Sequence, residues 1–139
     1  MSPEEHQTII RRYLDEAWNK GNVDIIDELM APNYARYMGT ATPLNREGQK
    51  QRILGFRRGF PDLHLTLEDI FATGDRVGFR MLLRGTHQGE FMRIAPTSKR
   101  VEVVAIDMAR FVDGKVVDQW GQTDTLGLLQ QLGATISVG

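Results

Sequence analysis

Residues 99–124 read KRVEVVAIDMARFVDGKVVDQWGQTD, and this stretch contains the strongest indication of the fold. The dipeptide Asp113-Gly114 in its middle is the one that a type I′ turn prefers, and apolar residues alternate with polar ones on both sides of it. The pattern predicts a hairpin of two antiparallel strands, residues 99–112 and 115–124. Because a two-residue turn fixes which residues face each other, the register of the hairpin can be counted from the turn.

In that register Val112 pairs with Lys115, and alternate pairs share one side of the sheet. We assign the side with small residues to the interior, because a few polar groups in an apolar cavity are typical of a small-molecule site. A β-bulge would shift this register by one residue. The opposite side is also partly apolar, which favours a cover by a second subunit. The interior side comprises Val103, Ala105, Asp107, Ala109, Phe111, Trp120, Gln122 and Asp124.

The rest of the chain changes its apolar period from about 3.6 to 2 near Pro61, so helices precede most of the strands. This order argues for an α+β fold with a curved antiparallel sheet packed by N-terminal helices around a pocket. Ser2 and Asn45 are expected to cap helices. Helices are predicted at 3–18, 23–30, 46–60 and 126–132, and strands at 33–37, 63–68, 76–84, 99–112 and 115–124.

Strand 76–84 supplies further candidate contacts, since Val77, Phe79, Met81 and Leu83 alternate with polar residues and define its inward set. Continuing the alternation brings His87 to the same side, at the mouth of the cavity. We therefore predict a substrate-binding set that consists of Trp120, Gln122, Tyr37, Phe79 and Met81.

The composition of the chain excludes several classes of function. The chain has 139 residues, which fits a single domain over 1–139. Its net charge of −1 does not indicate binding to nucleic acid or to a membrane surface. It has no cysteine and no apolar stretch of bilayer length. The N-terminus lacks the pattern of a secretory signal, so we expect a cytoplasmic protein. Three scattered histidines without ligand spacing predict no metal site, and no phosphate- or dinucleotide-binding motif is present.

Five motifs carry a family resemblance: GTHQGEF (85–91), IAPTSKRV (94–101), IDMARF (106–111), DGKVVDQW (113–120) and DTLGLLQQLG (124–133). They resemble the SnoaL-like polyketide and ester cyclases of the NTF2-like superfamily, and the likeness covers nearly the whole chain. The resemblance implies a cone-shaped α+β barrel, usually dimeric through its sheet, whose helices close a deep pocket. It also implies a small apolar carbonyl compound as the partner.

In the characterised cyclases an aspartate acts as acid–base in an intramolecular aldol ring closure, without metal or organic cofactor. The position that best matches this aspartate is Asp124. Relatives often carry histidines where this chain has Tyr37 and Gly121.

The resulting hypothesis is that Asp124 removes an acidic proton next to a carbonyl, and that His87 or Asp107 polarises the enolate oxygen. Simpler structural roles compete with each assignment. Asp124 could cap the terminal helix, Asp107 could satisfy a buried hydrogen bond, and His87 could be a solvated loop residue.

Three functions remain open from the sequence. The first is a cofactor-independent cyclase. The second is a binding protein for a small apolar molecule, in which Asp124 would be occupied in capping. The third is a hydrolase of the epoxide-hydrolase kind, which would need a carboxylate, an arginine and a second carboxylate deep in the pocket. Only Asp107 and Asp124 are plausible carboxylates, and the sequence places no arginine firmly inside.

Overall fold

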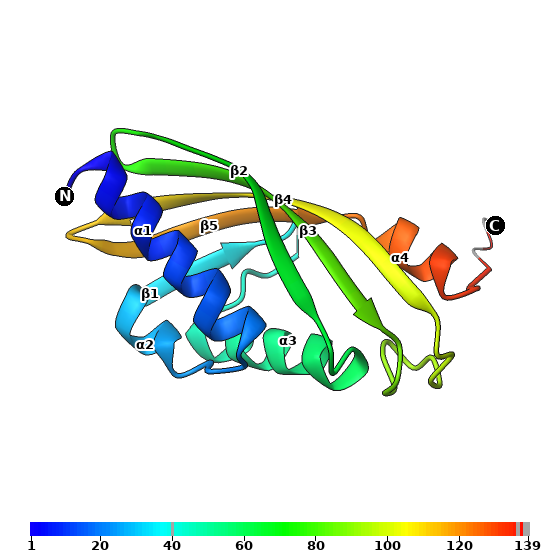
Figure 1. Cartoon of the computed structure of the whole chain (residues 1–139). Coiled ribbons are helices and arrows are strands. Elements are labelled where there is room, and N and C mark those ends of the chain that lie inside the picture. The colour runs from blue at the N-terminus through cyan, green and yellow to red at the C-terminus, as the bar shows by residue number, and fades with distance from the viewer. Residues whose placement is uncertain (40, 136, 138–139) are drawn as a thin grey trace.

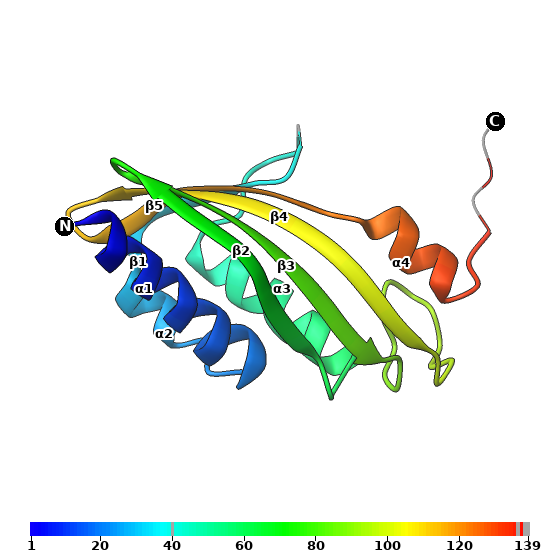
Figure 2. The same ribbon diagram turned by 45° about the horizontal axis from the view of Figure 1, so that its top comes forward.

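The computed structural model describes residues 1–39, 41–135 and 137. A curved five-stranded sheet has the strand order β1-β5-β4-β3-β2, and helices α1, α2 and α3 lie against its concave side (Figures 1 and 2). The α+β prediction is confirmed, with a sheet that curves but stays open. The strands are β1 (Met30–Tyr37), β2 (His64–Thr73), β3 (Arg76–Thr86), β4 (Arg100–Val112) and β5 (Lys115–Thr123). The helices are α1 (Pro3–Tyr13), the π-helix η1 (Leu14–Asn19), α2 (Ile25–Leu29), α3 (Arg46–Gly59) and α4 (Thr125–Gln131).

The predicted helix starts are confirmed. Ser2 forms a capping box with Glu5, and the Asn45 side chain accepts a hydrogen bond from the backbone nitrogen of Gly48. The first helix continues as the π-helix η1, which the periodicity did not predict. Trp18 of η1 is buried, and π-helical turns are frequent at functional sites.

Strands β2 to β5 form an antiparallel meander, but β1 pairs with β5 in parallel, which departs from the fully antiparallel prediction. This pairing sets Arg36 beside Gln119 and Tyr37 beside Trp120. Side chains therefore reach the concave side from the first strand and from the last strand at the same point of the sheet.

The predicted turn of the hairpin is confirmed: Asp113 and Gly114 have φ of 50° and 78°, as a type I′ turn requires. The pairs Val112–Lys115 and Phe111–Val116 are confirmed too. Beyond them the predicted register is wrong, because Arg110 pairs with Asp118 and leaves Val117 as the additional residue of a β-bulge. A shift of one residue exchanges the two faces of the rest of β5.

The bulge changes which side chains of β5 enter the interior. On β4 the predicted inner residues from Val103 to Phe111 are buried, as are the four inward residues of β3. On β5, however, Gln119 and Gly121 face inward, and Trp120 lies on the outer side, where its ring stacks on Tyr37 with centroids 5.8 Å apart.

In the part of the chain that the structure describes, no helix has both the length and the apolar character needed to cross a membrane.

The substitution Gly121→Ala tests the register. A Cβ at this position would collide with the Arg36 guanidinium and the Asp107 carboxylate. We expect this variant to lose about 1–3 kcal/mol of unfolding free energy in urea titrations, as overpacked interiors do. The control Gln122→Ala, on an exposed neighbour, should change it by less than about 0.5 kcal/mol. Equal effects of the two variants would contradict the bulge.

Candidate functional site

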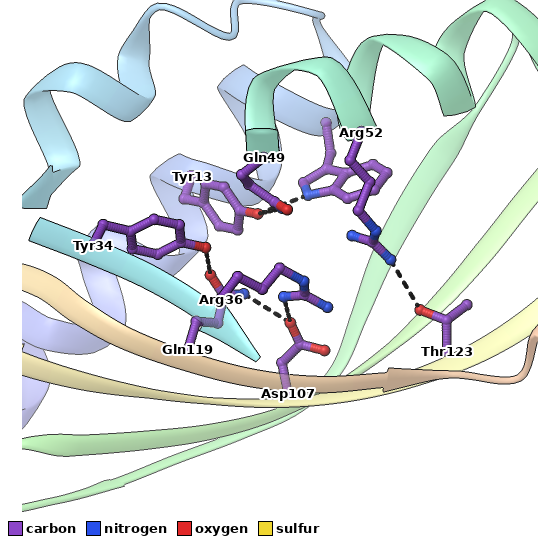
Figure 3. A network of polar contacts seen from close by, with 9 residues as sticks. Tyr13, Tyr34, Arg36, Gln49, Arg52, Asp107, Gln119 and Thr123 are labelled. Atoms are coloured by element: carbon purple, nitrogen blue, oxygen red, sulfur yellow. Dashed lines mark hydrogen bonds and ion pairs between the residues drawn. The ribbon is translucent and has the colours of Figure 1, made fainter. Parts of the chain in front are cut away.

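A buried ion pair forms the centre of the site (Figure 3). Arg36 of β1 donates from Nη1 to Asp107 Oδ2 of β4 over 2.6 Å, and the two side chains are only 2% and 5% exposed. Gln119 of β5 donates from Nε2 to the same oxygen over 2.7 Å. The hydroxyl of Tyr34 donates to Gln119 Oε1 over 2.6 Å. Three strands thus fix the orientation of one carboxylate.

The charges of this network depend on one another. Burial alone would lower the pKa of the Arg36 guanidinium. The nearby Asp107 and two tyrosines raise this pKa by more than burial lowers it, so the pKa of Arg36 is above its ordinary value. Burial also raises the pKa of Tyr34 well above its usual range, so Tyr34 stays a hydrogen-bond donor. A buried ion pair contributes little net stability once desolvation is counted. The network therefore suggests a role in function.

Two polar atoms of the ion pair are left without a partner. Asp107 Oδ1 and Arg36 Nε are buried, and neither has a hydrogen-bond partner among the described residues. Buried polar atoms in native proteins are nearly always hydrogen-bonded, so such an acceptor and donor point to a ligand.

Asp107 lines a small inner cavity of about 20 Å³, which is mainly apolar. A cavity of this size has room for about one water molecule. Its lining comes from α1, η1, α3 and all five strands. The lining residues are Tyr13, Leu14, Trp18, Arg36, Arg52, Phe56, Leu65, Met81, Leu83, Ala105, Asp107 and Thr123.

The hydroxyl of Tyr13 is a second polar group of this cavity. Its oxygen accepts from Trp18 Nε1 over 3.0 Å and from Gln49 Nε2 over 2.8 Å. Both bonds use the oxygen as acceptor, so the hydroxyl proton remains available for a carbonyl oxygen in the cavity.

A larger outer cavity of about 430 Å³ adjoins the inner one. The two share Arg52, Phe56 and Thr123 as lining residues. The remaining lining comes from Met38 just after β1, from α3, the loop after β3, the end of β5 and α4, and it includes the charged residues Arg58 and Glu90.

Of the residues predicted as substrate contacts, Met81 lines the inner cavity and Phe79 is buried in the core. The predicted interior position of Trp120 is wrong, because the bulge turns its ring to the outer side, where it stacks on Tyr37. Gln122 is exposed at the outer cavity for the same reason.

The structure places the three residues predicted as catalytic in different parts of the molecule. Asp107 is in the inner cavity, as expected. Asp124 is exposed, and its Oδ1 accepts from the backbone nitrogen of Gly127 over 2.9 Å, which is the capping role that the sequence left open. The predicted interior position of Asp124 is therefore wrong, again because of the bulge.

His87 is 0% exposed, so neither a solvated position nor the cavity mouth describes it. Its Nδ1 accepts from the backbone nitrogen of Thr97 over 3.2 Å, and its ring lies 5.4 Å from that of Phe60. Among the described residues, those that line the inner cavity do not include it.

Sequence reasoning missed the inward positions of Arg36, Gln119 and Arg52. A signal for Arg36 was available, since it alternates with Tyr34 in a predicted strand. Its side could not be chosen without knowing the partner strand. The described residues hold no group of three or more His, Asp or Glu placed to bind a metal, and the cofactor-free chemistry stays a prediction.

Comparison with known proteins agrees with the fold. The family model described as SnoaL-like polyketide cyclase matches residues 8–132. This chain belongs to that family. Among curated members of the SnoaL-like family, nogalonic acid methyl ester cyclase of Streptomyces nogalater is 31% identical over 84% of this chain and 90% of its own length. Aklanonic acid methyl ester cyclase AcmA of Streptomyces galilaeus is 29% identical over 93% of this chain and 91% of its own.

Solved structures of similar proteins extend the comparison. AclR, a candidate hydroxylase from Streptomyces galilaeus, superposes with a TM-score of 0.88 at 32% identity, covering 97% of this chain and 100% of its own. IdmH, a candidate polyketide cyclase from Streptomyces antibioticus, gives a TM-score of 0.81 at 35% identity, covering 93% and 99%. The SnoaL-like fold is thus shared with proteins of more than one description, so the chemistry has to be argued from the site.

The capping role of Asp124 makes a prediction of its own. Asp124→Ala should lower the unfolding free energy by about 1 kcal/mol, because the first turn of α4 loses its acceptor. Asp124→Asn should stay close to the parent protein, since asparagine caps about as well. Urea unfolding of both variants measures this, and an unchanged stability of Asp124→Ala would contradict the cap.

Proposed function

We propose that this chain closes a ring in a polyketide ester or ketone by an intramolecular aldol reaction, with Asp107 as the acid–base group. Two curated relatives are cyclases of polyketide methyl esters. The observation that carries the proposal is the unpartnered Oδ1 of Asp107, whose carboxylate lines the mainly apolar inner cavity.

In the proposed reaction Asp107 Oδ1 removes a proton from the carbon beside the ester carbonyl. The enolate carbon then attacks a ketone of the same molecule and forms the new carbon–carbon bond. The resulting alkoxide takes the proton back, so the reaction is an isomerisation that consumes no other reactant. Positioned proton transfer of this kind contributes about 10²–10⁴-fold to a rate.

The surrounding residues position these groups. Arg36 and Gln119 bind the other oxygen of Asp107 and leave Oδ1 directed at the substrate. The free hydroxyl proton of Tyr13 is suited to bind the carbonyl whose oxygen becomes negative. Trp18 and Met81 offer apolar walls beside Asp107 for the part of the substrate that enters the inner cavity.

Two alternatives are less well supported. Pure binding fits the capping role of Asp124, but it does not explain why the buried pair of Arg36 and Asp107 lies beside the partly buried Arg52. For hydrolysis of the epoxide-hydrolase kind, the structure supplies the arginine that the sequence did not place, because Arg36 is buried in the interior. The second carboxylate that it needs is not among the described residues that line the inner cavity.

Turnover of nogalonic or aklanonic acid methyl ester, followed by chromatography of the cyclic product, tests the proposal. Asp107→Asn should lower kcat by about 10²-fold or more. Asp124→Asn removes the carboxylate that the family likeness indicated but keeps the cap, and it should turn over at close to the parent rate. Thermal unfolding of both variants checks that they are folded during the assay. Loss of turnover in Asp124→Asn with full turnover in Asp107→Asn would overturn the assignment.

We further propose a homodimer through the outer side of the sheet. This side carries a hollow of about 690 Å³ lined by Tyr37, Phe71, Ile106, Met108 and Trp120, among others. Phe71 and Ile106 are 67% and 58% exposed. An apolar patch of this kind is typical of an interface, and a second copy presents the same patch to it. A cytoplasmic location is proposed on the cysteine-free composition alone.

Ile106→Glu should shift the protein from dimer to monomer in sedimentation velocity, because each copy would bury an unpaired carboxylate at the interface. Val112→Glu is the matched control: it is also exposed but lies at the hairpin turn, outside the lining of this hollow, and should remain dimeric. A parent protein that is monomeric at tens of micromolar would refute the proposal.

A further inference from the structure

Arg52, which is partly buried, differs from the fully buried Arg36 of the site. Arg36 has Asp107 as its partner at 2.6 Å, whereas among the described residues Arg52 has no acidic group within ion-pair distance. Its guanidinium makes one hydrogen bond to the described part of the chain, to Thr123 Oγ1, and this bond is long at 3.4 Å. Its Cζ lies 5.5 Å from the ring centre of Trp18 and 5.2 Å from that of Phe56. Aromatic faces attract this cation but do not neutralise it.

The charge balance around the inner cavity is therefore positive. Two guanidinium groups, Arg36 and Arg52, face one carboxylate, Asp107 (Figure 3). Burial, together with the positive charge of Arg36, lowers the pKa of Arg52 to about 10, so Arg52 is still charged at neutral pH. A cation in a largely apolar setting is costly unless an anion accompanies it.

The position of Arg52 is also suited to meet a ligand. Its side chain reaches from α3 toward Thr123 on β5, and it lines both the inner cavity and the outer cavity. The inner cavity of about 20 Å³ is too small for a polyketide, so most of such a molecule has to lie in the outer cavity of about 430 Å³. A group that extends from the outer cavity toward Asp107 passes the Arg52 guanidinium.

We propose that Arg52 binds the negatively charged oxygen of the substrate, which is the enolate oxygen formed when Asp107 takes the carbon-bound proton. The inference rests on the proposed cyclisation. The proton moves from carbon to Asp107 Oδ1, and the electron pair it leaves is delocalised onto the carbonyl oxygen that Arg52 contacts. The site thus selects ligands that are anionic or become so during reaction.

Calorimetric binding of 2-naphthoate and methyl 2-naphthoate tests this assignment without turnover. The two probes share a flat aromatic ring and differ in charge. The parent protein should prefer the carboxylate by about 10-fold or more, the range of a charge-assisted hydrogen bond. Arg52→Gln should abolish that preference while the affinity for the ester changes little, and Arg52→Lys should keep part of it.

Arg46→Gln is the matched control, because it removes the same charge from the same helix at a residue that contacts Asp27 and lines neither cavity. It should retain the full preference. The proposal is overturned if the parent protein shows no preference, if Arg52→Gln keeps it, or if Arg46→Gln loses it equally. Should Arg52→Gln not fold, Arg52→Lys decides: a preference equal to or above that of the parent protein contradicts the assignment.

Kinetics separate this inference from the proposed function. On a methyl ester, which is neutral before reaction, Arg52→Gln should lower kcat far more than it raises KM, because the interaction forms only with the enolate. If Asp107→Asn abolishes cyclisation and Arg52→Gln leaves both kcat and the carboxylate preference intact, the cyclase proposal stands and the role of Arg52 falls. If no ester is turned over, the binding comparison still tests Arg52.

Discussion

The buried ion pair between Arg36 and Asp107 is the constraint around which the interior is arranged. It joins the first strand to β4 across the width of β5, and it requires that the residue between them have no side chain, which Gly121 provides. Gln119 completes the contact from the same strand. The parallel pairing of β1 with β5 and the bulge at Val117 bring these groups to one point.

This arrangement explains how a mainly apolar interior can hold a carboxylate in a defined orientation. Oδ2 of Asp107 accepts two hydrogen bonds, and Oδ1 has no partner among the described residues. The carboxylate is therefore held in place while one of its oxygens stays available to a ligand. Aromatic residues of α1, η1 and α3 close the space above it, and Arg52 adds a positive charge at the entrance from the larger cavity. The family's chemistry can be carried by these residues although the aspartate singled out by likeness, Asp124, serves as a helix cap.

Much of the architecture could be predicted from the sequence, because the features concerned are determined by residues close together in the chain. Caps at Ser2 and Asn45, the turn at Asp113-Gly114 and the alternation on β3 and β4 depend on neighbouring residues, and all were confirmed. The residues of β5 that face the interior could not be predicted, because the additional residue Val117 exchanges the two faces of the strand. No residue type in the sequence indicates a β-bulge at this position. The side to which Arg36 points depends on a strand more than 80 residues away, so the candidate site was only half predicted: Asp107 and Met81 were found, Arg36 and Arg52 were not.

The roles proposed for the surrounding residues all require that Asp107, inside the concave side of the sheet, is the carboxylate that meets the substrate. A crystal structure of the protein with the cyclic product of its own reaction tests this most directly. We expect a product oxygen or the reacting carbon against Asp107 Oδ1, with the ring system extending past Trp18 and Phe56 into the outer cavity. Product bound beside Asp124, or on the outer side against Trp120, would contradict it.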